Sequence, residues 1–247
     1  MKPDRGRLWY RFIRGVAALF FRVIGGPRVL HGDRVPMNGP VLMAPIHMSF
    51  LDPPLMAVAT RRGLSFMAKE ELFRGPLGKL ISSLESFPVR RGEGDSEAIK
   101  EAVRRLSVGR AVLVFPEGTR GRGDVMGPIS SGIAMFARRS EAVVVPCGIL
   151  GTERAWGKGQ KLRRAKLTVC FGQPFTYSEI ATGANEKENR ELFAQELAAR
   201  IAAACQEAGL KVAVNPANLP QTKTEVQTEA TCSPDGTPIA SSADRGV

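Results

Sequence analysis

Short apolar runs alternate with helix-like stretches between about residues 28 and 180, and this alternation constrains the fold more than any other feature. Strand–helix alternation of this kind is typical of an α/β fold. We therefore expect a largely parallel, mixed sheet flanked by helices. The predicted strands are 41–44, 64–67, 86–89, 111–115, 142–147 and 166–171, and the predicted helices are 53–60, 70–82, 96–107, 130–139 and 185–209.

The two ends of the chain differ in composition from this central region. Residues 5–26 have the periodicity of a single helix that ends at Gly25-Gly26-Pro27, as glycine and proline end helices. From Ala213 to Val247 there is no aromatic residue, so too little apolar surface is available to offset the entropy of ordering. We predict an amphipathic helix in 1–27, an α/β domain in 28–212 and a disordered tail in 213–247.

The predicted N-terminal helix has two contrasting faces. At about 100° per residue, Arg7, Arg11, Arg14 and Arg22 fall on one narrow stripe, while large apolar side chains spread over the other side. Such a pattern is typical of a helix lying in a membrane interface. An ordinary surface helix packed on the domain has an apolar face too, so both interpretations stay open here.

The net charge of +11 indicates a polyanionic partner, such as an anionic membrane, a phosphorylated substrate or a nucleic acid. The sequence carries no aromatic–basic nucleic-acid motif, so we expect no nucleic-acid partner. No apolar run reaches the ~18 residues that a transmembrane helix needs. Arginines interrupt residues 8–24, which also lack a small-residue cleavage site, so a signal peptide is not expected.

Metal and disulfide chemistry are not expected either. The four cysteines are widely scattered with no C-x-x-C pair, which suits a reducing compartment rather than a disulfide scaffold. The only two histidines, His31 and His47, have no cysteine at ligand spacing, so we predict no zinc site.

The first segment that can carry chemistry runs from Pro45 to Pro53. It places His47 and Asp52 where a strand passes into a helix, a common position for binding sites in α/β folds. In a regular helix their side chains would diverge, so they meet only if the intervening segment turns. If they meet, Asp52 accepts a hydrogen bond from one imidazole nitrogen and leaves the other free as a base. Alternatively, Asp52 caps the following helix and His47 is an ordinary loop residue.

The second such segment, from Val112 to Arg120, is a strand running into a turn, with a Gly-rich stretch after it. Arg120 offers a planar fork suited to phosphate oxygens. Thr119 and the backbone N–H groups near Gly118 could supplement it. The alternative is a polar turn with an incidental arginine.

In this order and about 70 residues apart, the two segments closely resemble the glycerolipid acyltransferase family, in particular its bacterial 1-acyl-sn-glycerol-3-phosphate acyltransferases. The family's H-x4-D motif matches His47 and Asp52, and its F-P-E-G-T-R motif matches Phe115 through Arg120. The resemblance spans about residues 28–180. Further matches are Ser49, the Met67–Phe73 stretch with Lys69, the Phe87–Arg91 stretch with Arg91 as the family's arginine, and Val145-Pro146. Two residues, Ile46 and Arg90, depart from the common pattern.

The resemblance implies roles for the matched residues. His47 would deprotonate the acceptor hydroxyl, and Asp52 would orient it and stabilise the imidazolium. Lys69, Arg91 and Arg120 would hold the acceptor phosphate, helped by Gly118 and Thr119, while Glu117 would orient Arg120 or contact the substrate. No acyl-enzyme is implied, because Cys147 and Cys170 lie in predicted strands and G-x-S-x-G is absent.

The implied reaction moves a fatty acyl group from acyl-CoA or acyl carrier protein to the sn-2 hydroxyl of 1-acyl-glycerol-3-phosphate, making phosphatidic acid. It needs no cofactor and no metal. The expected partners are the lyso-phospholipid acceptor, the acyl donor and an anionic membrane surface, with the protein peripheral or monotopic on the cytoplasmic face of the cell membrane. The alternatives are an acyltransferase for glycerol-3-phosphate or a lyso-ornithine lipid, and a non-catalytic peripheral lipid-binding protein.

Overall fold

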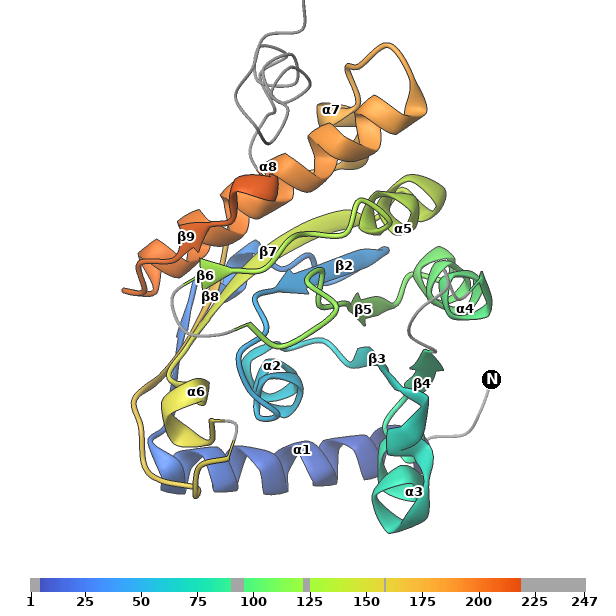
Figure 1. Ribbon diagram of the computed structural model, residues 1–247. Coiled ribbons are helices and arrows are strands. Elements are labelled where there is room, and N and C mark those ends of the chain that lie inside the picture. The colour runs from blue at the N-terminus through green and yellow to red at the C-terminus, as the bar shows by residue number, and fades with distance from the viewer. Residues whose placement is uncertain (1–4, 90–95, 122–124, 158, 219–247) are drawn as a thin grey trace, which may run out of the picture.

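A computed structural model describes residues 5–89, 96–121, 125–157 and 159–218, with side chains from residue 8 onward. Its centre is a seven-stranded sheet in the order β1-β8-β7-β2-β5-β3-β4 (Figure 1). All neighbouring strands are parallel except β7 and β8, which confirms the predicted largely parallel, mixed sheet. The strands are β1 Pro27–Leu30, β2 Val41–Pro45, β3 Leu64–Lys69, β4 Ser86–Val89, β5 Ala111–Leu113, β7 Val143–Leu150 and β8 Leu167–Phe171.

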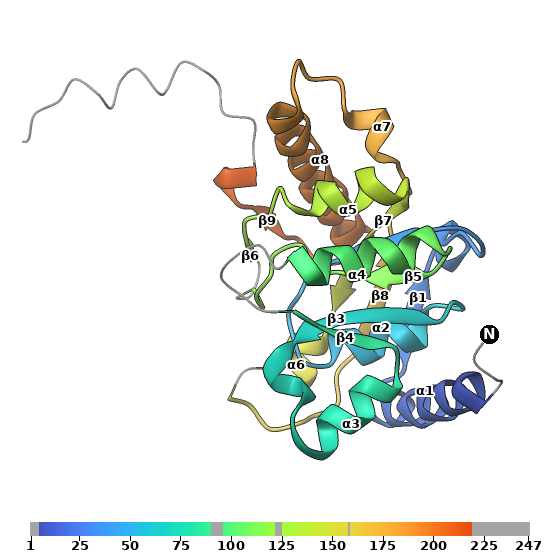
Figure 2. The same cartoon turned by 90° about the vertical axis from the view of Figure 1, so that its right-hand side faces the viewer.

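Helices cover both faces of the sheet. In two views at right angles, α4, α5 and α8 lie on one face, while α2 lies on the other with α1 beyond it (Figures 1 and 2). The α-helices are α1 Arg5–Ile24, α2 Asp52–Ala59, α3 Gly75–Ser83, α4 Ser96–Ser107, α5 Ile133–Ser140, α6 Thr152–Ala155, α7 Tyr177–Ile180 and α8 Glu186–Glu207. Short 3₁₀ helices are η1 Gly32–Arg34, η2 Glu70–Phe73 and η3 Pro216–Asn218.

The central strands owe their near-continuous apolar character to this covering. Every residue of β2, β5 and β8 is buried, as expected for strands with helices on both faces. Val41 of β2 pairs with Ala111 of β5 on one side and Val143 of β7 on the other. The carboxyl ends of β2 and β5 therefore lie side by side, and both chemistry-bearing segments leave the sheet there.

Two sequence expectations need correction. The helix expected at 70–82 is divided into η2 and α3, because Gly75 has a positive φ of 68° and Pro76 lacks an N–H donor. The tail expected from Ala213 onward is ordered at first: β9 Ala213–Val214 pairs with β6 Val125–Met126, and Asn218 is buried. The Asn218 amide accepts from Ile129 N–H at 2.8 Å and donates to Gly127 O at 3.0 Å, contacts too distant in sequence for composition to reveal. Residues 219–247 lie outside the described part.

Helix α1 has one side packed on the domain and another that exposes apolar side chains. One side packs on α2, and there Phe21 is 0% exposed. A second side presents large apolar side chains, with Phe12 60% and Leu19 65% exposed. The expected arginine stripe is only partly on the surface, because Arg14 is half-buried while Arg11 and Arg22 are exposed. Within the described residues, no helix has both the length and the apolar character needed to cross a membrane.

Candidate active site

The loop between β2 and α2 turns back on itself and brings His47 to Asp52. His47 Nδ1 lies 2.8 Å from Asp52 Oδ2. The same oxygen accepts the backbone N–H groups of Met48 at 2.6 Å and Ser49 at 2.7 Å. One carboxylate oxygen therefore organises the loop and binds the imidazole, which is the turn that the sequence required for the two side chains to meet.

The alternative role of Asp52 as a helix cap is not what the structure shows. Asp52 is the first residue of α2, and its side chain bonds backward to the loop. Pro53 and Pro54 follow it and have no N–H to offer, and Leu55 N–H donates to Leu51 O at 3.0 Å, so no capping donor reaches the Asp52 side chain. Asp52 is 0% exposed, and its Oδ1 has no hydrogen-bond partner among the described residues.

His47 presents its remaining ring nitrogen for chemistry. Because the Asp52 carboxylate can only accept, Nδ1 carries the proton of the neutral ring and Nε2 is left as a proton acceptor. The ring stacks on Phe115, with 3.8 Å between centroids and 23° between planes. Its side chain is 14% exposed and lines a cavity of about 2050 Å³. The arrangement can therefore remove a proton from a group bound in that cavity.

Glu117 hydrogen-bonds the protein backbone rather than Arg120. Its Oε1 accepts His47 N–H at 2.9 Å and its Oε2 accepts Gly127 N–H at 2.8 Å. Burial raises the pKa of Glu117, while the two backbone N–H groups partly oppose that rise. Both carboxylate oxygens are thus engaged by the protein itself, so Glu117 orients the His47 backbone and not Arg120. The guanidinium of Arg120 instead stacks over the Phe50 ring at 3.7 Å.

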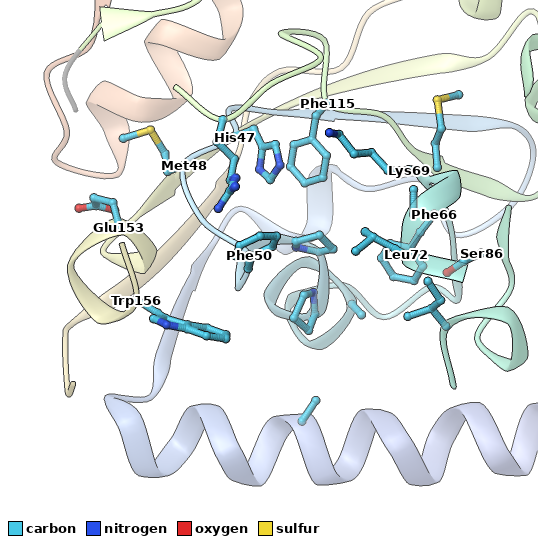
Figure 3. Close-up of a pocket in the computed structure, with 18 of the residues that line it drawn as sticks. His47, Met48, Phe50, Phe66, Lys69, Leu72, Ser86, Phe115, Glu153 and Trp156 are labelled. Atoms are coloured by element: carbon cyan, nitrogen blue, oxygen red, sulfur yellow. The ribbon is translucent and has the colours of Figure 1, made fainter. Parts of the chain in front are cut away.

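The other predicted site residues converge on the same cavity wall as His47. Figure 3 shows Lys69 on one side of the His47–Phe115 stack and Trp156 on the other. Gly118, Thr119 and Arg120 also line the cavity. Arg91, the remaining candidate phosphate ligand, lies outside the described residues.

The cavity also has an extended apolar wall. α1, η2 and α3 supply much of it, and Trp9 of α1 donates to Ser83 Oγ of α3 at 2.8 Å, which ties the two helices together. Apolar side chains in this wall include Ile13, Phe66, Leu72, Leu77, Leu80 and Ile81. The site thus joins a histidine with one ring nitrogen free, and cations, to a space suited to aliphatic chains.

Sequence reasoning missed the segment that follows α6. Ser49 Oγ donates to Trp156 O at 2.8 Å, which fastens this segment to the His47 loop. Gly121 N–H donates to His47 O at 2.7 Å and fastens the second motif there as well. A run of basic residues at 161–166 was the available signal, but nothing local to the sequence placed it beside His47.

The buried cysteines and a possible metal cluster lie apart from this chemistry. Cys147 and Cys170 are buried, as expected; burial raises the pKa of Cys147 well above its usual value and that of Cys170 to about 11. Among described residues, donor atoms of His31, Cys170 and Glu207 lie within 4.8 Å of one another. Arg34 Nη1 already pairs with Glu207 Oε2 at 3.2 Å, and His31 Nε2 lies 3.0 Å from the same oxygen, so the Glu207 carboxylate is already engaged and the cluster is not an open cation site.

Comparisons with known proteins identify a family for the chain. A family model described as Acyltransferase matches residues 27–150. A 1-acyl-sn-glycerol-3-phosphate acyltransferase of Cocos nucifera is 27% identical over 157 residues, which cover 62% of this chain and 51% of that protein. A lyso-ornithine lipid O-acyltransferase of Pseudomonas aeruginosa is 32% identical over 112 residues, covering 44% and 43%. The chain spans about half the length of the first of these relatives.

A solved structure has the same fold. The crystal structure of the 1-acyl-sn-glycerophosphate acyltransferase PlsC from Thermotoga maritima superposes with a TM-score of 0.68 at 23% identity. The match covers 84% of this chain and 83% of that one, so it extends well beyond the two motifs.

Proposed function

The chain belongs to the acyltransferase family, and from that premise we propose that it transfers a fatty acyl group from an acyl thioester to the sn-2 hydroxyl of a 1-acyl-glycerol-3-phosphate. The product is phosphatidic acid. The observation that carries this proposal is the His47–Asp52 pair on the wall of a cavity that combines cations with an apolar lining.

In the proposed mechanism His47 is a general base. Its Nε2 removes the proton of the acceptor hydroxyl, and the oxygen attacks the thioester carbonyl carbon. When the tetrahedral intermediate collapses, the C–S bond breaks, the thiolate leaves, and the imidazolium returns the proton to it. A positioned general base contributes roughly 10²–10⁴-fold to such a step. No acyl-enzyme is formed.

Asp52 supports this cycle electrostatically. The imidazolium forms 2.8 Å from a carboxylate that is fully buried, where charges interact more strongly than in water. The same carboxylate keeps the ring oriented with Nε2 available. Asp52 is therefore proposed to stabilise the imidazolium form of His47 that exists while the proton is being transferred.

The acceptor phosphate is proposed to bind the cations on the cavity wall. Lys69 supplies a point charge and Arg120 a planar fork, which its stacking on Phe50 holds flat. Thr119 and the Gly118 backbone border the same space. Arg91 remains a predicted phosphate ligand on the strength of its motif.

We propose a peripheral position on an anionic membrane, at its cytoplasmic face. The exposed apolar side of α1 supplies the hydrophobic contribution, at about 25 cal/mol per Å² buried. Arg11 and Arg22 add about 1 kcal/mol each before salt screening. Because residues of α1 and α3 also line the cavity, an amphiphilic acceptor can enter it from the bilayer without passing fully into water.

A second acceptor deserves a direct test, because the similarity to the lyso-ornithine lipid O-acyltransferase has the higher identity of the two relatives named above. That acceptor is built on an amino acid rather than on glycerol phosphate. Transfer to it would leave Lys69 and Arg120 without a phosphate to bind.

The deciding experiment uses the purified full-length chain, a labelled acyl donor and a panel of lyso-acceptors, with products identified by mass spectrometry. Acylation of 1-acyl-glycerol-3-phosphate in preference to the others supports the proposal, and preference for lyso-ornithine lipid replaces its acceptor. His47→Ala should abolish transfer while circular dichroism and thermal unfolding remain those of a folded protein. Turnover like that of the wild type in this variant would sink the mechanism.

A further inference from the structure

A short basic segment borders the cavity on the side of Trp156. We name residues 159–166 the basic strap. It carries four exposed cations, Lys161, Arg163, Arg164 and Lys166, and within the described part of the chain no carboxylate pairs with any of them. Three of the four line the cavity that contains His47. Unpaired cations gathered at a cavity wall favour an anionic ligand.

The basic strap is held in place along its length. Ala165 N–H donates to Ile24 O at 2.9 Å, and Arg163 N–H donates to Ala155 O at 2.9 Å. A Cβ on Gly25 would lie 1.8 Å from Ala165 O, so only glycine allows this close approach. The Arg163 guanidinium also bonds to Gln160 Oε1 at 2.5 Å. The strap backbone and the Arg163 side chain are therefore positioned before a ligand arrives, which reduces the entropy lost on binding.

The basic strap and Lys69 lie toward different sides of His47. Figure 3 shows Lys69 beyond the Phe115 ring, whereas Trp156, three residues before the strap, lies on the opposite side of His47. Acyl transfer to a phosphorylated acceptor needs two anionic substrates, with the reacting atoms meeting at the base. Arg120, the other proposed acceptor ligand, stacks on Phe50, whose ring lies 6.2 Å from that of Trp156, so it stands nearer the strap than a position beside Lys69 would. If Lys69 and Arg120 serve the acceptor phosphate, the strap is left for the donor.

Resting on the proposed function, we propose that the basic strap binds the phosphate groups of a coenzyme A thioester, so that acyl-CoA is the donor. The nucleotide end of coenzyme A concentrates several negative charges in a small volume, and arginine forks match phosphate oxygens. A carrier protein would dock on an outer surface, whereas Arg163, Arg164 and Lys166 line the cavity itself. The Ser49–Trp156 hydrogen bond ties the segment that leads into the strap to the His47 loop.

One acidic residue on this side does not oppose the proposal. Glu153 lines the cavity, but its Oε2 accepts Gly151 N–H at 2.9 Å and its Oε1 lies 3.3 Å from Arg154 Nε. Its charge is therefore compensated within the protein. The net field at the strap remains positive.

The test compares a strap variant, Arg163→Gln/Arg164→Gln, with a control of equal charge change, Arg139→Gln/Lys187→Gln. The control residues are exposed and lie on α5 and α8, on the opposite face of the sheet from α1 (Figure 1). The strap variant should raise KM for acyl-CoA about tenfold, equivalent to about 1.4 kcal/mol. The increase should disappear when the donor is the matching S-acyl-pantetheine, which lacks the nucleotide. The KM for the acceptor should stay within twofold.

A binding measurement separates this proposal from the proposed function. Adenosine 3′,5′-bisphosphate, titrated calorimetrically, should bind the wild type and the control, and bind the strap variant about tenfold more weakly. That result would support the strap even if the wild type transferred no acyl group. Equal binding to all three proteins overturns the proposal. A strap variant that changes only the acceptor KM, or only liposome binding, also overturns it. So does a wild type that accepts acyl groups from acyl carrier protein but not from acyl-CoA.

Discussion

Replacing Asp52 by asparagine preserves the size of the side chain and removes its charge. In the wild type, Asp52 Oδ2 receives three N–H groups, from His47 Nδ1 and from the backbones of Met48 and Ser49. An asparagine carbonyl can occupy this position as a neutral acceptor. Its NH₂ group must then take the place of Oδ1, which is buried and has no partner among the described residues.

The expected cost follows from these contacts. Hydrogen bonds to charged groups contribute about 1.5–3 kcal/mol and neutral ones about 0.5–1.5 kcal/mol, so three of them lose roughly 3 kcal/mol in all. A buried, unsatisfied NH₂ adds to the loss, while the lower desolvation cost of a neutral amide offsets part of it. We expect a net destabilisation of about 2 kcal/mol, which lowers the Tm by about 4–8 °C in a domain of this size.

Activity should fall more steeply than stability. A neutral amide cannot compensate the imidazolium, so kcat should decrease about 10²-fold, less than in His47→Ala. Urea unfolding and initial-rate kinetics measure the two effects, with Asp33→Asn as the control because Asp33 is an exposed carboxylate. Wild-type stability together with turnover within threefold of the wild type would refute the assignment. A lower stability with unchanged turnover would leave Asp52 a purely structural role.

Three further changes test other parts of the structure. Glu117→Gln should destabilise the fold by about 1–2 kcal/mol, because an amide keeps only one acceptor for two N–H donors. Since burial raises the Glu117 pKa above 4.5, wild-type stability should fall as pH rises from 4.5 through that pKa, and urea titrations should show no such fall in the variant. Arg120→Lys keeps the charge but loses the fork, so initial rates should show a raised acceptor KM; a raised donor KM instead would reassign the site. Phe12→Ser/Leu19→Ser should reduce co-sedimentation with anionic liposomes at every salt concentration, whereas equal binding would place the anchor elsewhere.

The sequence predicted best those elements whose signal is local. The strand Ser86–Val89 and the helix Ser96–Ser107 match the expected ranges to the residue. The sequence did not predict the edge strand β1 or the strand pair formed between distant segments. In β1 the central residues Arg28 and Val29 are exposed, so this edge strand lacks an apolar run. The β6–β9 pair joins two-residue strands far apart in sequence, which periodicity cannot detect.

The candidate site shows the same division between local and long-range information. The spacing of His47 and Asp52 indicated a possible pair, but whether the loop turned depended on two backbone N–H groups that no residue type reveals. The backbone contacts of Glu117 were not foreseen for a related reason: they are made with main-chain donors, and one of these lies in a loop after the motif. The basic strap is visible as composition, but only the fold places it at the cavity.

The two motifs that suggested the function both hold the same residue, His47, in this structure. Asp52, from the first motif, holds the ring of His47, while Glu117, from the second, holds its backbone N–H. Two buried or half-buried carboxylates thus fix one histidine from different directions, and Gly121 N–H binds the same residue's carbonyl oxygen. A loss of activity on changing Glu117 therefore does not by itself identify a substrate contact, because displacement of His47 would have the same effect. Only a variant that leaves the His47–Asp52 geometry intact can distinguish a lost substrate contact from a displaced His47.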